Sequence, residues 1–166
     1  MITIIAGTNR KGSSTKKIAI EYKKLLAEKN VEAKLLALDE IEVFVRNDVF
    51  ETMENEYIKS ADKFIFIMPE YNGSFPGILK LMIDNSDVAN VWHNKKALLT
   101  GVSSGRAGNM RGMEHFTGSL LHIKVTVHPN RLPISSVHNV LDDAGIIIDA
   151  SVIKTIQTQL EEFLNF

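Results

Sequence analysis

Residues 7–15 combine two glycines with hydroxyl, amide and basic side chains. This first loop follows the apolar run 2–6, which is typical of a buried strand, and precedes a helical pattern that begins near Lys16. The first N–H groups of a helix have no internal partner, and the helix dipole makes that end partly positive. A strand, a short polar loop and a helix start therefore predict a site for a phosphate group.

The side chains of the first loop limit what kind of phosphate it could hold. Candidate hydrogen-bond donors are Thr8, Asn9, Arg10, Ser13, Ser14 and Thr15. The loop is not a Walker A sequence, because Ser13 stands where that motif has lysine, and it lacks the three-glycine dinucleotide pattern. We therefore expect a single phosphate, held as part of a mononucleotide, with an ordinary polar turn as the alternative.

Two further glycine-containing loops follow continuous apolar runs at 63–68 and 97–102, each typical of a strand buried on both faces. The second loop is Pro69-Glu70-Tyr71-Asn72-Gly73-Ser74-Phe75-Pro76-Gly77, and the third is Ser103-Ser104-Gly105-Arg106-Ala107-Gly108. Eight of the ten glycines lie in or beside these three loops. Glycine permits close main-chain approach, so the pattern indicates a flat ligand across one edge of a sheet.

The remaining pattern alternates strands with helices. Strands are expected at residues 2–6, 31–38, 63–68, 97–102 and 123–127. Helices are expected at about residues 16–29, 51–59, after Pro76, 109–121 and 152–164. Residues 41–45 fit either a short strand or a loop, and 128–142 is expected to be a loop or a short extension. We predict one α/β domain over 1–166, a flavodoxin-like five-stranded parallel sheet of order 2-1-3-4-5, with ligands at the carboxyl ends of the strands.

Composition excludes several other classes. The net charge of -1 and the absence of a basic cluster argue against nucleic-acid binding. The chain has no cysteine, so thiolate catalysis and disulfides are excluded, and its five histidines show no metal-ligand spacing. No apolar run approaches the roughly 20 residues of a membrane helix, and no signal-peptide pattern is visible. We expect a cytoplasmic protein with no membrane partner and no metal.

One run of residues carries a more specific signal: Pro69-Glu70-Tyr71-Asn72-Gly73-Ser74, then Pro76-Gly77, Leu79-Lys80 and Ile83-Asp84. This run resembles the signature of the NAD(P)H-dependent FMN reductases, flavodoxin-like oxidoreductases that include quinone, azo-dye and chromate reductases. The resemblance covers most of the chain, including the first and third loops.

The resemblance implies where FMN would lie. The first loop, chiefly Arg10, Ser13 and Thr15, would bind the phosphate. The second loop would follow the ribityl chain and the isoalloxazine edge, with main-chain amides near Asn72 and Gly73 at its N5–O4 side, and the third loop would border the other end of the ring. The candidate cofactor-binding residues are Thr8, Asn9, Arg10, Ser13, Ser14, Thr15, Pro69, Glu70, Tyr71, Asn72, Gly73, Ser74, Ser103, Ser104, Gly105 and Gly108.

The implied activity is hydride transfer from NADPH or NADH to flavin N5, then electron transfer to a small electrophilic acceptor such as a quinone, an azo compound or free flavin. The flavin carries this chemistry, so no catalytic side chain is expected. A flavodoxin-type electron carrier is the alternative, although such carriers are usually strongly acidic and this chain has a net charge of -1. A phosphate-binding module without redox function would leave the second and third loops without a purpose.

The resemblance also implies a homodimer or homotetramer. Leu81 and Met82 occupy positions usually held by asparagine and alanine, and Asn85-Ser86 stand where a tryptophan is common. These positions lie on a helix that family members often use in dimer packing, so the expected oligomer rests on the resemblance alone.

Overall fold

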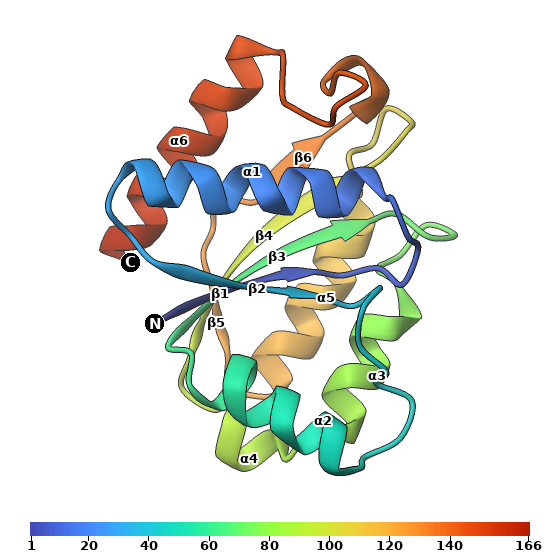
Figure 1. Cartoon of the computed structure of the whole chain (residues 1–166), viewed down its shortest axis with the longest axis vertical. Coiled ribbons are helices and arrows are strands. Elements are labelled where there is room, and N and C mark those ends of the chain that lie inside the picture. Colours follow the sequence, from blue (N-terminus) through green and yellow to red (C-terminus); the bar gives the residue numbers. More distant parts are fainter.

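The structure is a computed structural model that describes residues 1–166, and it places a parallel sheet between two layers of helices (Figure 1). The body of the sheet consists of β1 (Ile2–Ala6), β2 (Ala33–Ala37), β3 (Lys63–Pro69) and β4 (Lys96–Val102). With β5 (Thr126–Val127) at the edge, the strand order is β2-β1-β3-β4-β5 and every pairing is parallel. The predicted order is confirmed, and the carboxyl ends of the strands meet at one edge, on the right in Figure 1.

Two short strands share the position beside β4. β5 (Thr126–Val127) pairs with the start of β4, and β6 (Leu132–Ile134) pairs with its last three residues. The five predicted strands are all present, and β6 adds a sixth within the segment expected to be a loop or a short extension. The predicted strand at 123–127 also began too early, since Lys124 has a left-handed backbone (φ 59°) at the end of the preceding helix.

The helices cover both faces of the sheet. One layer contains α1 (Ser14–Glu28) and α6 (Ala150–Asn165). The other contains α2 (Asp48–Met53), a π-helical segment (Glu54–Lys59), α3 (Gly77–Asn85), α4 (Val88–Val91) and α5 (Met110–His122). The predicted helices are confirmed with small shifts of their ends. None of these helices has the length and apolar character that crossing a membrane requires.

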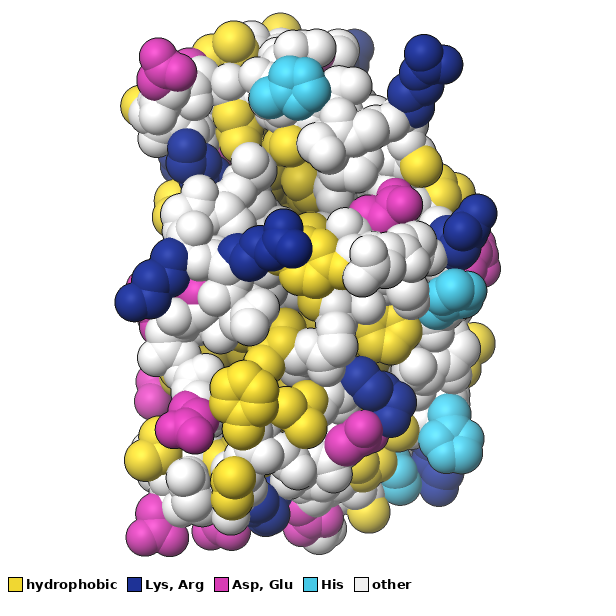
Figure 2. All heavy atoms as spheres, turned by 90° about the vertical axis from the view of Figure 1, so that its right-hand side faces the viewer, with side chains coloured by type: hydrophobic (Ala, Val, Ile, Leu, Met, Phe, Trp, Pro, Cys, Tyr) yellow, Lys and Arg dark blue, Asp and Glu magenta, His cyan; other side chains and the backbone are white.

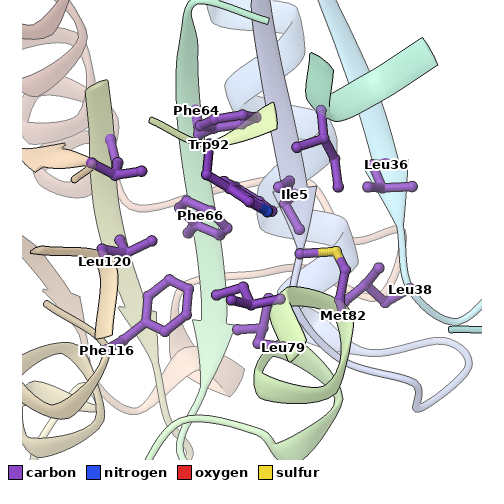
Figure 3. Packing of buried hydrophobic residues seen from close by; sticks show 14 of the residues in the cluster. Ile5, Leu36, Leu38, Phe64, Phe66, Leu79, Met82, Trp92, Phe116 and Leu120 are labelled. Atoms are coloured by element: carbon purple, nitrogen blue, oxygen red, sulfur yellow. The ribbon is translucent and has the colours of Figure 1, made fainter. Parts of the chain in front are cut away.

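Successive side chains of the central strands point to opposite faces, so each strand feeds two cores. In β3, Ile65 and Ile67 pack toward α1 and α6, whereas Phe64 and Phe66 pack toward α2–α5. Figure 3 shows the second core, where the fully buried Trp92 lies beside Phe64 and Phe66 with ring centroids 4.8 and 6.3 Å apart. Burial on both faces explains the continuous apolar runs in the sequence.

The segment between β2 and α2 is a loop, not a strand. Arg46 donates from Nη1 and Nη2 to the buried Glu54 carboxylate at 3.1 and 2.8 Å, and from Nη1 to the Asn85 carbonyl at 2.9 Å. Asn85 in turn donates to the Val43 carbonyl at 2.8 Å. These contacts tie the loop to the end of α3, on the same side of the sheet as α2.

Candidate cofactor site

The three predicted loops meet around a cavity of about 300 Å³ at the carboxyl ends of β1, β3 and β4. Its lining residues are Arg10, Lys11, Ser13, Ser14, Thr15, Pro69, Glu70, Tyr71, Val102, Ser103, Ser104 and Val137. Figure 2 shows the molecule with this edge toward the viewer. Lys and Arg side chains lie beside shallow grooves, and apolar side chains are visible within these grooves. The structure thus brings all three loops together, as the sequence predicted.

Not every candidate residue lines this cavity. Seven candidates lie next to it in the chain but are absent from its wall: Thr8, Asn9, Asn72, Gly73, Ser74, Gly105 and Gly108. Three lining residues were missed. Lys11 lies within the first loop and Val102 ends β4, so both were close to the predicted site. Val137 had no such signal, because a short 3-10 helix (Val137–Asn139) brings it in from a remote segment.

The first loop leaves the backbone N–H groups at the start of α1 without hydrogen-bond partners. Ser13 is the N-cap, and its hydroxyl accepts only from the Lys16 N–H, at 3.2 Å. The backbone N–H groups of residues 11–15 donate to no atom of the chain. The first turn of α1 carries no acidic residue. Unpartnered N–H groups at a partly positive helix end, beside a cavity, fit the phosphate of FMN.

The charges near this helix start differ in their surroundings. Lys16 is engaged away from the cavity, where its hydrogen bonds to Glu40 and Asp39 hold the pKa of its ammonium group above the usual value. Arg10 and Lys11 line the cavity and form no ion pair within the chain. These two side chains therefore supply positive charge that an external anion could neutralise.

Thr8 and Tyr71 join the first loop to the second. Thr8 is 1% exposed, and its hydroxyl hydrogen-bonds to the Tyr71 hydroxyl and accepts from the Arg10 N–H at 3.2 Å. The Arg10 guanidinium carbon lies 4.2 Å from the centroid of the Tyr71 ring, a cation–π contact. Thr8 is therefore a link between the loops, whereas Asn9 is exposed and makes no side-chain contact of this kind.

The second loop closes as a two-residue hairpin at residues 71–74. Tyr71 and Ser74 exchange backbone hydrogen bonds of 2.9 and 3.1 Å. The two central residues, Asn72 (φ 51°) and Gly73 (φ 75°), both have left-handed backbones, which is the requirement of a type I′ turn. Their N–H groups donate to no atom of the chain, so they remain available to a ligand.

The third loop is stabilised by Ser103. Its hydroxyl donates to the Gly105 carbonyl and accepts from the Gly108 N–H, both at 2.9 Å. The segment after β6 supports the loop from outside, since the Val137 N–H donates to the Ser103 carbonyl at 3.0 Å. Gly108 has a left-handed backbone (φ 55°), and a Cβ there would lie 2.4 Å from Pro133, so this glycine serves packing.

The comparisons with known proteins agree with this geometry. Residues 1–139 match the family model described as NADPH-dependent FMN reductase. The chain belongs to this family. An NAD(P)H-dependent FMN reductase of Pseudomonas aeruginosa is 36% identical over 111 residues, which are 64% of this chain and 59% of that protein. A quinone reductase of Pseudomonas putida is 32% identical over 123 residues, 69% of this chain and 65% of that protein. The chain thus spans less than two thirds of the length of these curated relatives.

Solved structures match the fold over nearly the whole chain. A flavoenzyme NAD(P)H:acceptor oxidoreductase from Paracoccus denitrificans superimposes with a TM-score of 0.80 at 24% identity, covering 99% of this chain and 94% of that one. An NADH:FMN oxidoreductase in its apo form gives a TM-score of 0.77 at 17% identity, and the match covers 98% of this chain and 87% of that one. At these identities the likeness establishes the flavodoxin-like fold.

Proposed function

We propose that the chain is an FMN-dependent NAD(P)H oxidoreductase that reduces small electrophilic acceptors. The observation that carries this proposal is the open start of α1, whose free N–H groups adjoin the same cavity as the second and third loops. Membership of the NADPH-dependent FMN reductase family supports it, as do relatives described as an FMN reductase, a 2-hydroxy-1,4-benzoquinone reductase and quinone reductases.

In this proposal the first loop holds the phosphate. The N–H groups of residues 11–15 and the hydroxyls of Ser13, Ser14 and Thr15 donate to its oxygens, and Arg10 and Lys11 balance its charge. The helix dipole contributes at most about 2 kcal/mol, whereas each charge-assisted hydrogen bond contributes roughly 1.5–3 kcal/mol. Direct hydrogen bonds therefore dominate the affinity for the phosphate.

The second and third loops hold the ring. The free N–H groups of Asn72 and Gly73 donate to one edge of the isoalloxazine, and Ser103 and Ser104 border its other end. Bound FMN supplies the redox chemistry, by accepting a hydride from NADPH or NADH and passing electrons to the acceptor. Fixed backbone N–H groups stabilise negative charge that develops on the reduced ring without any reorganisation of the protein.

The test begins with the visible spectrum of the purified protein after addition of FMN. We expect a bound-flavin spectrum that NADPH or NADH bleaches without oxygen and that a quinone, an azo dye or free FMN restores. A protein that acquires no flavin spectrum would contradict the proposal. If flavin binds but neither nicotinamide reduces it, while a reduced protein partner does, the chain is a flavodoxin-type electron carrier instead. Steady-state rates with both nicotinamides would identify the preferred donor.

The proposed oligomer is a homodimer or homotetramer, supported by the family resemblance. Sedimentation equilibrium of the FMN-loaded protein checks it, and a single monomeric species at micromolar concentration would contradict it. A cytoplasmic location stays a prediction of the sequence.

A further inference from the structure

Asn109 stands where the third loop passes into α5, outside both the predicted site and the cavity wall. Its side chain is fully buried, at 0% exposure, and its backbone is left-handed (φ 61°). Its Nδ2 donates to the carbonyls of Met68 and Pro69 at 3.1 and 2.8 Å. These are the last two carbonyls of β3, so Asn109 holds the point where the chain leaves the sheet to form the hairpin at 71–74.

The surroundings of Asn109 leave no room for another arrangement. A Cβ on Gly112 would lie 2.0 Å from Asn109 Oδ1 and 2.8 Å from the Phe75 nitrogen. A Cβ on Gly101 would lie 2.9 Å from the Asn109 Cβ. Both neighbours must therefore be glycine, and the Asn109 side chain fills the space where β4, α5 and the residue after the hairpin come together.

The choice of asparagine here has a cost. Asn109 Oδ1 is buried and accepts no hydrogen bond, and a buried acceptor without a partner lowers stability. Glycine would adopt the left-handed backbone more easily and would avoid this buried oxygen. What asparagine adds is the pair of hydrogen bonds from Nδ2 to the end of β3.

We propose that Asn109 is a positioning residue for the flavin ring, which rests on the function proposed above. By holding the carbonyls of Met68 and Pro69 it fixes the hairpin relative to the third loop. The hairpin carries the free N–H groups of Asn72 and Gly73, and the third loop carries Ser103 and Ser104. Asn109 thus sets the width of the slot between the two ends of the ring without touching the phosphate end.

Two variants remove the hydrogen bonds of Asn109 without requiring a change in its left-handed backbone conformation. Asn109→Gly keeps the left-handed conformation and removes the whole side chain. Asn109→Asp keeps the shape but replaces the Nδ2 donor with an oxygen that faces two carbonyls. Asn94→Gly is the matched control, because Asn94 also has a left-handed backbone (φ 64°), is exposed and precedes β4 at the opposite edge of the sheet.

The experiment measures dissociation constants for FMN and riboflavin well below each variant's Tm, and hydrogen exchange of residues 69–75 in the flavin-free protein. We expect both Asn109 variants to bind FMN and riboflavin about tenfold more weakly, because both ligands carry the ring that the hairpin contacts. Hydrogen exchange of residues 69–75 should accelerate in both Asn109 variants. Asn94→Gly should match the wild type in flavin affinity and in this hydrogen exchange.

Unchanged flavin affinity in both Asn109 variants would overturn the proposal, even if exchange accelerates or Tm falls, because the residue would then serve stability alone. If either Asn109 variant does not fold, the other decides. A wild type that binds no FMN would overturn the proposed function. Unchanged hydrogen exchange of residues 69–75 in the flavin-free variants would instead show that the Asn109 side chain does not hold the hairpin in place.

Discussion

Helices α1 and α6 pack on the same face of the sheet (Figure 1), but their first N–H groups are capped differently. At α6 the N-cap is Asp149, whose carboxylate accepts from the N–H groups of Ser151 and Val152 at 2.8 and 3.3 Å. At α1 the N-cap is Ser13, a neutral hydroxyl that accepts from Lys16 N–H alone. One helix start therefore carries its own anion, and the other carries none.

This difference shows that a positive helix end is not a site by itself. Both helices have the same dipole, but only α1 leaves its first N–H groups unpartnered beside a cavity lined by Arg10 and Lys11. At α6 the chain supplies its own carboxylate, and in the proposed function the free N–H groups of α1 receive the phosphate of FMN. An acidic cap at α1 should therefore weaken phosphate binding, whereas removal of the cap at α6 should lower stability alone.

The largest effect is expected from Ser13→Asp, which gives α1 the kind of cap that α6 has. Aspartate is as good an N-cap as serine, so the protein should fold. Its carboxylate would occupy the free N–H groups and repel the phosphate, so FMN should bind at least about 100-fold more weakly. Riboflavin affinity should stay close to that of the wild type. Titration by flavin fluorescence checks both values, and an FMN loss matched by riboflavin would contradict the assignment.

Arg10→Ala should have the next largest effect. It removes one charge-assisted contact to the phosphate, so FMN affinity should fall about tenfold. The same titration with riboflavin provides the control, because a ligand without a phosphate should respond only to loss of the Tyr71 contact. Equal losses for both flavins would mean that Arg10 acts through the Tyr71 ring and not on the phosphate.

Asp149→Ala addresses the other helix start. Loss of this cap should lower Tm by about 2–4 °C, because two N–H groups of α6 lose their acceptor. FMN affinity, measured below the transition, should not change. A large loss of FMN affinity in this variant would show that the two ends are not independent.

The smallest effect is the pH dependence of the α6 cap. The Ser151 hydroxyl and the N–H groups of Val152 and Ser151 hold the pKa of Asp149 below its usual value. A carboxyl with a lowered folded-state pKa stabilises the protein above its unfolded pKa, and this contribution is lost as pH falls through the folded value. The Tm difference between wild type and Asp149→Asn should therefore shrink below about pH 4. A difference that is constant with pH would argue against a charged cap.

Most of the fold was predictable because the central strands are buried on both faces. The runs that became β1, β3 and β4 are continuously apolar, and the loops after them carry glycine. β6 was not predictable, since it is three residues long with an exposed Pro133 and depends on pairing with β4. The start of β5 was misjudged because Lys124 adopts a left-handed backbone that the alternating pattern at 123–127 does not reveal.

The site was predictable only in part for a similar reason. Residues within each loop were found from local sequence, whereas Val137 reaches the cavity through the segment after β6. Asn109 follows the third loop directly, but its role depends on carbonyls of Met68 and Pro69, about 40 residues earlier in the chain. No local sequence pattern predicts contacts between residues so far apart in the chain.

The most direct test of the account compares the affinities of the wild-type protein for FMN and riboflavin under the same conditions. These ligands share the ring and the ribityl chain and differ in the phosphate. An open α1 start that makes at least two charge-assisted hydrogen bonds of about 1.5 kcal/mol each predicts that FMN binds about 100-fold more tightly. Equal affinities, or no binding of either ligand, would contradict it.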